Sequence, residues 1–350
     1  MEKYYTRACN FYFGKISVLK VKKKISLPLH GNKNISFDHI EIISRKSNKI
    51  IHLKDIYKLN KKIKNKVKSD LNKITKKKYF YKLNLSKMPL TMGVLNLTPD
   101  SFSDGGKYNN KNKAYIFLKK LIRNGADIID IGGESTRPGS QQISEKKEWK
   151  RIYSTLMKIK KFKKVISLDT RKSLIMEKGI KYGVDIINDV SGLEYDSISI
   201  NVIKKFNSPF VIHHMQGTPS TMQINPKYKN VLLDIYDFFE KKISFVRKKG
   251  IKHNNILIDP GIGFGKNLKH NITLISNISI FHSLGFPVLI GVSRKKFIKY
   301  ISGINDSKER LGGTISAVLF SLLQGVQIVR VHDVNEIKQS IKVFKSILNG

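Results

Sequence analysis

Residues 126–139 read ADIIDIGGESTRPG, and this stretch shows the repeating unit of the chain. A short β-branched run ends in an aspartate and glycines, and apolar residues at helical spacing follow at 144–160. The run is typical of a buried strand and the following stretch of an amphipathic helix. Working outward along the chain, further β-branched runs occur at 91–97, 165–169, 185–189, 210–214, 256–259, 288–292 and 326–332.

The stretches between these runs carry apolar residues at helical spacing, notably 112–124, 174–182, 231–249, 307–323 and 334–348. Continuous apolar strands that alternate with helices indicate a parallel sheet covered on its outside. Eight strand and helix units in about 260 residues match a (β/α)₈ TIM barrel. The pattern therefore predicts an α/β protein of this class, with a doubly wound open sheet as the alternative, because periodicity alone does not show closure.

Charge is spread unevenly over the 350 residues, whose formal net charge is +40. Residues 1–87 hold 24 Lys and Arg against 5 Asp and Glu, while residues 88–350 hold 42 against 21. A nucleic-acid or anionic-lipid footprint is one explanation. A coding bias towards Lys, Asn and Ile is the favoured one, because the excess continues through segments that otherwise look like ordinary core elements. Nucleic acid is therefore not an expected partner.

The first 87 residues are interpreted as a small basic appendage of unknown role, separate from a barrel domain at 88–350. Short strands are expected at 39–44 and 49–53, and a helix at 53–74. Lysines and aromatics alternate at 76–82 (KKKYFYK), which could stack on bases, but an edge strand guarded by lysines is the favoured reading.

A barrel places its chemistry at the carboxyl ends of its strands. Each predicted strand here ends in polar side chains, namely Asn96, Asp130, Asp169, Asn188, Asp189, His213, His214, Asp259, Ser293, Arg294, Lys295, Arg330, His332 and Asp333. One such residue alone could merely cap the next helix. Eight strands that share the feature predict a functional rim.

The cations Arg137, Arg330 and His332 suit a phosphate or diphosphate. Asn96 offers a neutral oxygen that could help to hold Mg²⁺, an ion that takes few protein ligands beside water and phosphate. The adjacent His213 and His214 do not resemble a zinc site, because neighbouring side chains in a strand point to opposite faces.

Asp169, Asn188 and Asp259 form a set of acceptors on three strands, and such carboxylates pair well with the NH and NH₂ edge of a pterin or guanine. Alternatively, the two aspartates only neutralise nearby lysine and arginine side chains. Phe264 could stack on a flat heterocycle or could simply pack within its loop. No Ser-His-Asp or Cys-His pattern occurs, so covalent nucleophilic catalysis is not expected.

Eight motifs in order resemble dihydropteroate synthases: MGVLNLTPDSFSDGG (92–106), IIDIGGESTRPG (128–139), SLDTRK (167–172), INDVSG (187–192), HMQGTP (214–219), DPGIGFGK (259–266), GVSRK (291–295) and RVHDV (330–334). The resemblance covers nearly all of residues 88–350. Arg171 and Lys296 are small departures from the usual pattern. A pterin-dependent methyltransferase barrel is the alternative, although it needs neither TRPG nor SRK.

The resemblance implies a transferase of folate biosynthesis, which joins 6-hydroxymethyl-7,8-dihydropterin diphosphate to 4-aminobenzoate and releases diphosphate. It implies catalytic roles for Arg137, Lys295, Arg330 and His332, and Mg²⁺ at Asn96. The pterin would contact Asp169, Asn188, Met215, Asp259, Phe264 and Lys295. The aminobenzoate would border on Thr136, Pro138 and Ser293, with loops 98–110 and 134–142 closing over it.

Other expectations concern the whole protein. The single cysteine, Cys9, cannot form an internal disulfide, and no apolar run approaches the length of a membrane span, so a cytoplasmic protein is expected. The resemblance also implies a possible homodimer. Residues 1–87 are too few for a fused kinase that would make the substrate.

Overall fold

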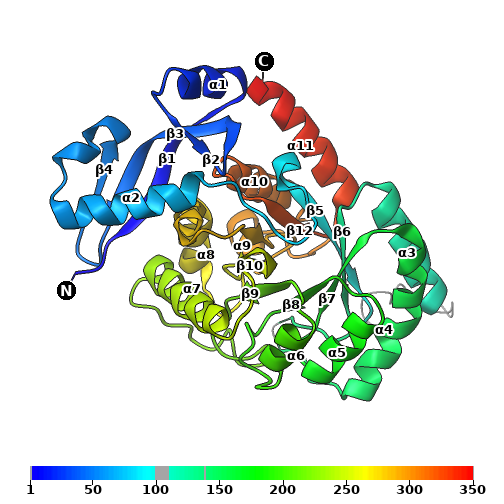
Figure 1. Cartoon of the computed structure of the whole chain (residues 1–350). Helices are drawn as coiled ribbons and strands as arrows, with labels where there is room; N and C mark the ends of the chain where they lie inside the picture. The colour runs from blue at the N-terminus through cyan, green and yellow to red at the C-terminus, as the bar shows by residue number, and fades with distance from the viewer. Residues whose placement is uncertain (1, 99–109, 138, 350) are drawn as a thin grey trace.

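The computed structural model describes residues 2–98, 110–137 and 139–349. Eight parallel strands form a curled sheet with helices outside it, and a small antiparallel sheet lies at one side (Figure 1). The strands of the large sheet are β5 (Leu90–Asn96), β6 (Ile128–Gly132), β7 (Val165–Asp169), β8 (Ile186–Asp189), β9 (Phe210–His213), β10 (Ile256–Asp259), β11 (Leu289–Ile290) and β12 (Ile328–Val331). All eight predicted strands are present.

The large sheet closes into a barrel. Its strand order is β10-β9-β8-β7-β6-β5-β12-β11, and a parallel bridge from Ile258 to Val288 joins the two end strands. The amide of Ile258 also donates to the carbonyl of Pro287 at 3.1 Å. The predicted (β/α)₈ barrel is thus confirmed, and the open-sheet alternative is wrong.

Helices cover the outside of the barrel, as the alternation of the sequence predicts. They are α3 (Asn110–Arg123), α4 (Glu145–Ile159), α5 (Ser173–Lys181), α6 (Ser199–Lys205), α7 (Val231–Lys248), α8 (Leu268–Ser276), α9 (Lys296–Ser302), α10 (Leu311–Leu322) and α11 (Val334–Asn349), with 3₁₀ turns η4 (Lys160–Phe162), η5 (His253–Asn255) and η6 (Ile278–Leu284). At the start of several of these helices, a polar side chain accepts a hydrogen bond from a backbone amide of the first turn. Ser144 accepts from the amide of Lys147 at the start of α4, and Asn230 caps α7 in the same way.

The inside of the barrel alternates by layer. Apolar residues from seven strands form a floor cluster that includes Leu90, Met92, Ile128, Ile186, Val211, Leu257, Leu289 and Ile328. Because side chains alternate along a strand, the residue two positions after a floor residue also points inward. On four strands that residue is Asp130, Asn188, Asp259 or Arg330. The period of two therefore places an apolar floor under a polar rim.

The N-terminal region forms a sheet and helices beside the barrel. Its elements are β1 (Tyr5–Phe13), α1 (Gly14–Lys22), β2 (Leu27–Leu29), β3 (Asn32–Ile43), β4 (Asn48–His52), η1 (Leu53–Lys58), α2 (Lys61–Thr75) and η2 (Leu85–Lys87). β3 is longer than the predicted strand 39–44 because β1 pairs with it from Tyr5↔Ile43 to Phe13↔Ile35. The helix expected at 53–74 is split, since Asn60 caps a new helix by accepting from the amide of Ile63 at 2.9 Å.

The edge strand predicted at 76–82 is wrong. Phe80 is fully buried in the floor cluster of the barrel, and its only bridge pairing is with Leu83 among the described residues. The Tyr81 hydroxyl and the Lys82 ammonium both donate to Asp185, next to β8. The segment therefore plugs the amino end of the barrel, where an aromatic side chain fills space that the short strands leave.

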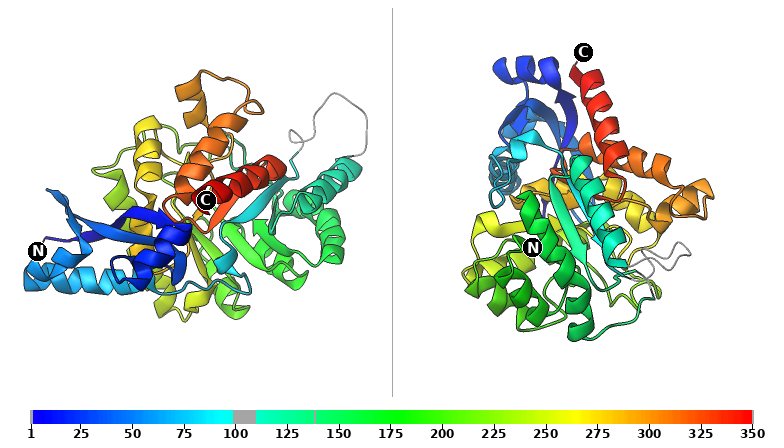
Figure 2. Two further views of the ribbon diagram at one scale, coloured as in Figure 1. Left: turned by 90° about the horizontal axis from the view of Figure 1, so that it is seen from above. Right: turned by 90° about the vertical axis from the view of Figure 1, so that its right-hand side faces the viewer.

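The N-terminal region shares core and polar contacts with the barrel. The ring of Tyr5 meets that of Tyr236 on α7 edge to face, with centroids 5.1 Å apart, and the Ser279 hydroxyl donates to the carbonyl of Ala8. Figure 2 shows the blue N-terminal elements against the barrel, with α1 beside the end of α11. The division into domains at residue 87 stays a prediction.

Among the described residues, no helix combines the length and apolar character needed to cross a bilayer.

Candidate active site

The carboxyl ends of the strands surround a cavity of about 660 Å³. That volume lies within the roughly 300–1,000 Å³ of small-molecule sites. Eight of the predicted site residues line it: Asn96, Thr136, Arg137, Phe264, Ser293, Lys295, Arg330 and His332. Side chains far apart in sequence thus meet at one end of the barrel.

The remaining predicted site residues lie close behind this lining or outside the described part of the chain. Asp169, Asn188 and Asp259 are buried at the ends of β7, β8 and β10, and Met215 packs with Phe264. Pro138 and all but the ends of the loop at 98–110 lie outside the described residues.

Arg330 links two carboxylates at the centre of the rim. Its Nε donates to Asp130 Oδ2 at 2.7 Å and an Nη donates to Asp169 Oδ2 at 3.0 Å. The Asn188 amide donates to the same Asp130 oxygen at 3.2 Å. The idea that Asp169 neutralises an arginine is therefore correct for one of its oxygens.

The other oxygens of this group are unused. Asp130 Oδ1, Asp169 Oδ1 and Asn188 Oδ1 are buried and have no hydrogen-bond partner among the described residues. Leaving a buried acceptor unpaired costs about 1–3 kcal/mol. A ligand that presents N–H groups here would remove that cost, which is a reason to place one at this site.

Burial sets the protonation of the acidic groups. It raises the pKa of Asp169, with Arg330 opposing the rise, and it raises the pKa of Asp259 to about 6. The same cause lowers the pKa of Lys295 to about 8, helped by the charge of Arg330. Groups with perturbed pKa values that gather at one end of a barrel are typical of functional sites.

An aromatic wall stands beside these groups. The ammonium of Lys295 lies 4.0 Å from the centroid of the Phe264 ring, and the His213 ring meets Phe264 edge to face at 4.6 Å. The loop from 260 to 266, which carries Phe264, requires glycine at position 261. Gly261 has φ +69°, and a Cβ there would lie 2.0 Å from the carbonyl oxygen of His214.

Ser293 and His332 form a hydrogen-bonded pair just after the ends of β11 and β12. Ser293 Oγ lies 3.0 Å from His332 Nδ1 and accepts from the backbone amide of His332 at 3.3 Å. A hydroxyl oxygen donates one hydrogen bond and accepts up to two, so Nδ1 either accepts from Ser293 or donates to it, according to the ring tautomer. Burial and the nearby charge of Arg330 keep the pKa of His332 well below its usual value, so the ring is neutral at pH 7.

A buried ionic cluster holds the loop that carries Thr136 and Arg137. Lys172 donates to Glu134 at 2.9 Å, to Glu148 on α4 at 2.7 Å and to the carbonyl of Ile143 at 2.7 Å. Glu134 in turn accepts from the amide of Ile143 at 3.0 Å. Both ends of the loop are therefore tied to one lysine. Arg171 joins the cluster through Glu134 and lies 4.1 Å over the ring of Tyr195.

The sequence pattern assigns no role to two residues of this site. Asp130 stands out only as a strand end, although its place two residues after Ile128 marks it as inward-facing. Lys266 is buried, and its ammonium contacts His214 Nδ1 at 2.9 Å and donates to the Phe264 carbonyl at 2.8 Å. Its position in DPGIGFGK carries no periodic signal, because the segment is a loop.

For Mg²⁺, the donor set is small. Among the described residues, no three His, Cys, Asp or Glu side chains gather to hold a metal ion. Asn96 supplies one amide oxygen on the same cavity as Arg137 and Arg330. One protein oxygen fits an ion that keeps several waters and binds substrate phosphate, so the residues are compatible with Mg²⁺.

Comparison with known proteins agrees with this geometry. Residues 92–332 match the family model described as pterin binding enzyme. The chain is 42% identical over 272 residues to the dihydropteroate synthase of Neisseria meningitidis serogroup B, covering 76% of this chain and 95% of that protein.

Solved structures give the same result. The dihydropteroate synthase of Yersinia pestis, in a sulfonamide complex, superposes with a TM-score of 0.72 at 37% identity, covering 77% of this chain and 97% of that one. The Xanthomonas albilineans enzyme in complex with 7,8-dihydropteroate has a TM-score of 0.69 at 30% identity, covering 76% and 95%. This chain belongs to the dihydropteroate synthase family of pterin-binding enzymes, the transferases of folate biosynthesis.

Proposed function

We propose that the rim cavity joins 6-hydroxymethyl-7,8-dihydropterin diphosphate to 4-aminobenzoate, with the residue roles given below. One observation carries the proposal. Asp169 Oδ1 and Asn188 Oδ1 are buried and have no partner among the described residues, while Arg330 donates to the other oxygen of Asp169 and shares the Asp130 carboxylate with Asn188. A single ligand can therefore present N–H groups to these oxygens and an anion to the Arg330 guanidinium.

The pterin occupies the acidic side of the rim. Its NH and NH₂ edge donates to Asp169 and Asn188, whose free oxygens lack partners among the described residues. Asp259 faces the charges of Lys295 and Arg330 and supplies a further carboxylate. The ring lies against Phe264 and Met215, since these side chains pack together beside the acceptors.

The diphosphate occupies the basic side. Arg137, Arg330 and His332 line the same cavity and offer N–H donors. In the tautomer in which Ser293 donates to Nδ1, the neutral His332 ring donates to the diphosphate through Nε2. Donors aimed at charge that develops on a leaving group accelerate its departure.

The reaction exchanges a C–O bond for a C–N bond. The bond between the pterin methylene and the diphosphate oxygen breaks, and the electron pair leaves with diphosphate. The methylene carbon, whose positive charge is shared with the dihydropterin ring near Asp169 and Asp259, accepts the lone pair of the arylamine nitrogen. The nitrogen then loses its proton to water. An arylamine is a free base at neutral pH, so no strong general base is needed.

The aminobenzoate enters beside Thr136 and Ser293, which line the cavity next to the diphosphate donors. Pro138 is assigned to the same border from the sequence motif. Bound Mg²⁺ would be held by Asn96 and would supply charge neutralisation to the diphosphate. Residues 88–350 are proposed as the catalytic domain, and a homodimer stays a prediction.

The test is an assay of the purified chain with Mg²⁺ and both substrates, following dihydropteroate by chromatography and diphosphate by a coupled assay. We expect equimolar products. An intact, folded protein that forms neither product would contradict the proposal, as would transfer of a methyl group from a methylated pterin.

A further inference from the structure

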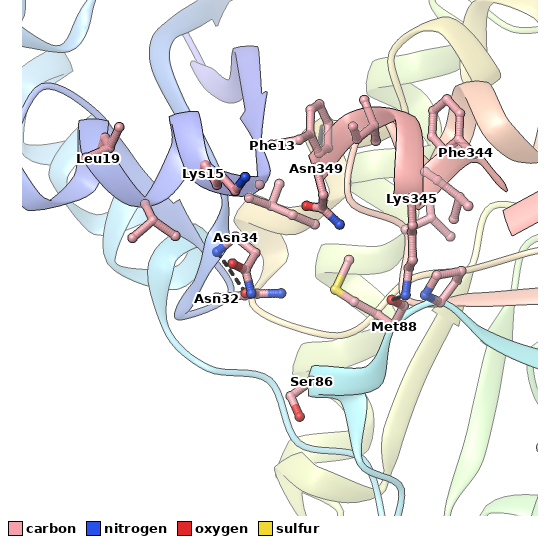
Figure 3. A pocket seen from close by; sticks show the side chains of 17 residues that line it. Phe13, Lys15, Leu19, Asn32, Asn34, Ser86, Met88, Phe344, Lys345 and Asn349 are labelled. Atoms are coloured by element: carbon pink, nitrogen blue, oxygen red, sulfur yellow. Dashed lines mark hydrogen bonds between the residues drawn. The ribbon is translucent and has the colours of Figure 1, made fainter. Parts of the chain in front are cut away.

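A second cavity lies at the seam between the N-terminal region and the barrel. Its volume is about 730 Å³, and it is lined by α1 and β3 on one side and by η2, α10 and α11 on the other. Figure 3 shows Leu19 and Lys15 on one wall, Phe344 and Lys345 on the opposite wall, and Met88 between them. The family model begins at residue 92, so the wall made by α1 and β3 lies outside the matched region.

The two walls meet closely at one point. Gly14, at the start of α1, has φ +57°, and a Cβ there would lie 2.5 Å from Asn349 Oδ1 and 2.8 Å from the carbonyl oxygen of Leu348. Only glycine combines that backbone conformation with so short an approach. The seam is therefore a close-packed contact around an open space.

The walls of this cavity are apolar, with Phe13, Ile35, Met88, Leu322, Phe344 and Leu348 among the lining side chains. Its mouth is apolar as well. Leu19 and Val18 line the cavity and are still 55% and 37% exposed. An occupant would thus gain by burying hydrocarbon or aromatic surface.

The polar groups of the cavity select the charge of the occupant. The charged side chains in the lining are Lys15 and Lys345, and no acidic side chain occurs among the described lining residues. The Lys345 ammonium donates to the Met88 carbonyl at 2.8 Å, which holds it at the cavity wall. An ammonium has three N–H donors, so others remain for a carboxylate.

We propose that this seam cavity binds an amphiphilic carboxylate, a molecule with an apolar body and one anionic head. The head pairs with Lys345 and Lys15, and the body lies among the apolar walls. A cationic or zwitterionic amphiphile lacks a matching acidic group.

The seam cavity is separate from the active site. Met88 and Pro89 precede β5 and Val326 precedes β12, so the cavity lies at the amino ends of strands whose carboxyl ends carry Asn96 and Arg330. The seam cavity is therefore a separate site from the rim cavity, and the proposal does not depend on the reaction.

The test is calorimetric titration of the full chain with hexanoate, octanoate and decanoate. We expect saturable one-to-one binding that tightens about three- to fourfold for each added methylene, which corresponds to about 0.8 kcal/mol. Decylamine is the charge-reversed probe and should not bind. Absence of binding, equal binding of decylamine, or affinity independent of chain length would overturn the proposal.

Variants locate the site. Lys345→Gln should weaken decanoate binding at least fivefold, while Lys342→Gln, one turn earlier on α11 and outside the cavity, should leave it unchanged. Val18→Trp should fill the mouth and abolish binding, with turnover retained as the sign of a folded protein. If decanoate binds Val18→Trp as it binds the parent chain, the carboxylate lies elsewhere and the proposal is wrong.

Discussion

Asp130 shows how a single buried carboxylate can position Arg330, which we propose contacts the diphosphate. It is fully buried, and one of its oxygens accepts from both Arg330 and Asn188. Without it, Arg330 would be held by Asp169 alone among the described carboxylates. A charge-assisted hydrogen bond of this kind contributes about 1.5–3 kcal/mol.

We expect Asp130→Asn to lower kcat/KM for the pterin diphosphate about 10- to 100-fold, because Arg330 loses its strongest anchor. Steady-state kinetics with each substrate varied would measure this. Asp127→Asn is the matched control, since Asp127 lies just before the same strand and pairs with Lys338. Full activity of Asp130→Asn would show that Arg330 needs no such support.

Lys295 should give the pH profile an alkaline limb. Its pKa is lowered to about 8, chiefly by burial, so it loses its positive charge as the pH rises through 8. We expect kcat/KM for the pterin diphosphate to fall above pH 8 in the parent chain. Lys295→Arg stays charged in that range, so its profile should stay flat to about pH 10. An unchanged alkaline limb in Lys295→Arg would assign the titration to another group.

At the scale of elements, the cluster around Lys172 connects α4, α5 and the loop from 134 to 143. Lys172, Glu134 and Glu148 are all buried, and burial of an ion pair is stabilising only while each charge keeps its partner. Three buried charged side chains hold the loop that carries Thr136 and Arg137. We infer that the position of this loop matters for the site.

We expect Glu134→Gln to raise KM for 4-aminobenzoate about 5- to 20-fold with little change in kcat, because the loop loses one charged tie of about 1–2 kcal/mol. Initial-rate kinetics would separate the two parameters. Lys172→Met should cost about 3–5 kcal/mol of unfolding free energy, since it leaves the buried Glu148 without a cationic partner and Glu134 with Arg171 alone among the described residues.

The control for both variants is Lys181→Met, an exposed lysine on α5 that pairs only with Glu177 among the described residues. It should change neither KM nor stability measurably. An equal effect of Lys181→Met would mean that the loss of any charge on α5 suffices.

At the scale of the whole molecule, two buried histidines lie at the junction of the N-terminal region and the barrel. The rings of His30 and His282 meet edge to face with centroids 4.4 Å apart, and His282 Nε2 donates to the Gln324 carbonyl at 2.7 Å. Burial lowers the pKa of His282 to about 4, and the pKa of His30 is also well below its usual value.

These pKa values predict acid lability of the junction. Between about pH 6.5 and 4 the unfolded chain binds a proton at His282 that the folded chain does not, so stability falls as the pH falls through that range. His282→Gln keeps an N–H donor for Gln324 and should flatten the slope by at most about 1.4 kcal/mol per pH unit. Urea unfolding from pH 4.5 to 7 would measure it, and parallel curves for variant and parent would contradict the assignment.

The net charge of +40 should make stability depend on salt. Self-repulsion destabilises a compact state, and salt screens it over about 10 Å at 0.1 M. We expect the Tm to rise when NaCl is raised from 20 to 300 mM. A Tm that falls over this range would mean that the surface ion pairs outweigh the repulsion.

The barrel and most of its rim could be predicted from local pattern. The β-branched runs and the helical spacing are properties of neighbouring residues, and the period of two in a strand already places Ile128 below Asp130 and Ile186 below Asn188. The segment at 76–82 could not be predicted in this way. Phe80 is buried in a space that forms only when eight strands, far apart in the sequence, close into a barrel.

The amino-acid sequence by itself determined the eight strand and helix units, the polar residues at the strand ends and the motifs of the family, because each is written within a few neighbouring positions. Tertiary structure decided which charges pair, that Arg330 joins Asp130 to Asp169, that Lys172 ties a loop, and that a cavity opens where α1 meets α11. The physical reason is distance along the chain: these contacts join residues tens to hundreds of positions apart, and only the closed fold brings them together.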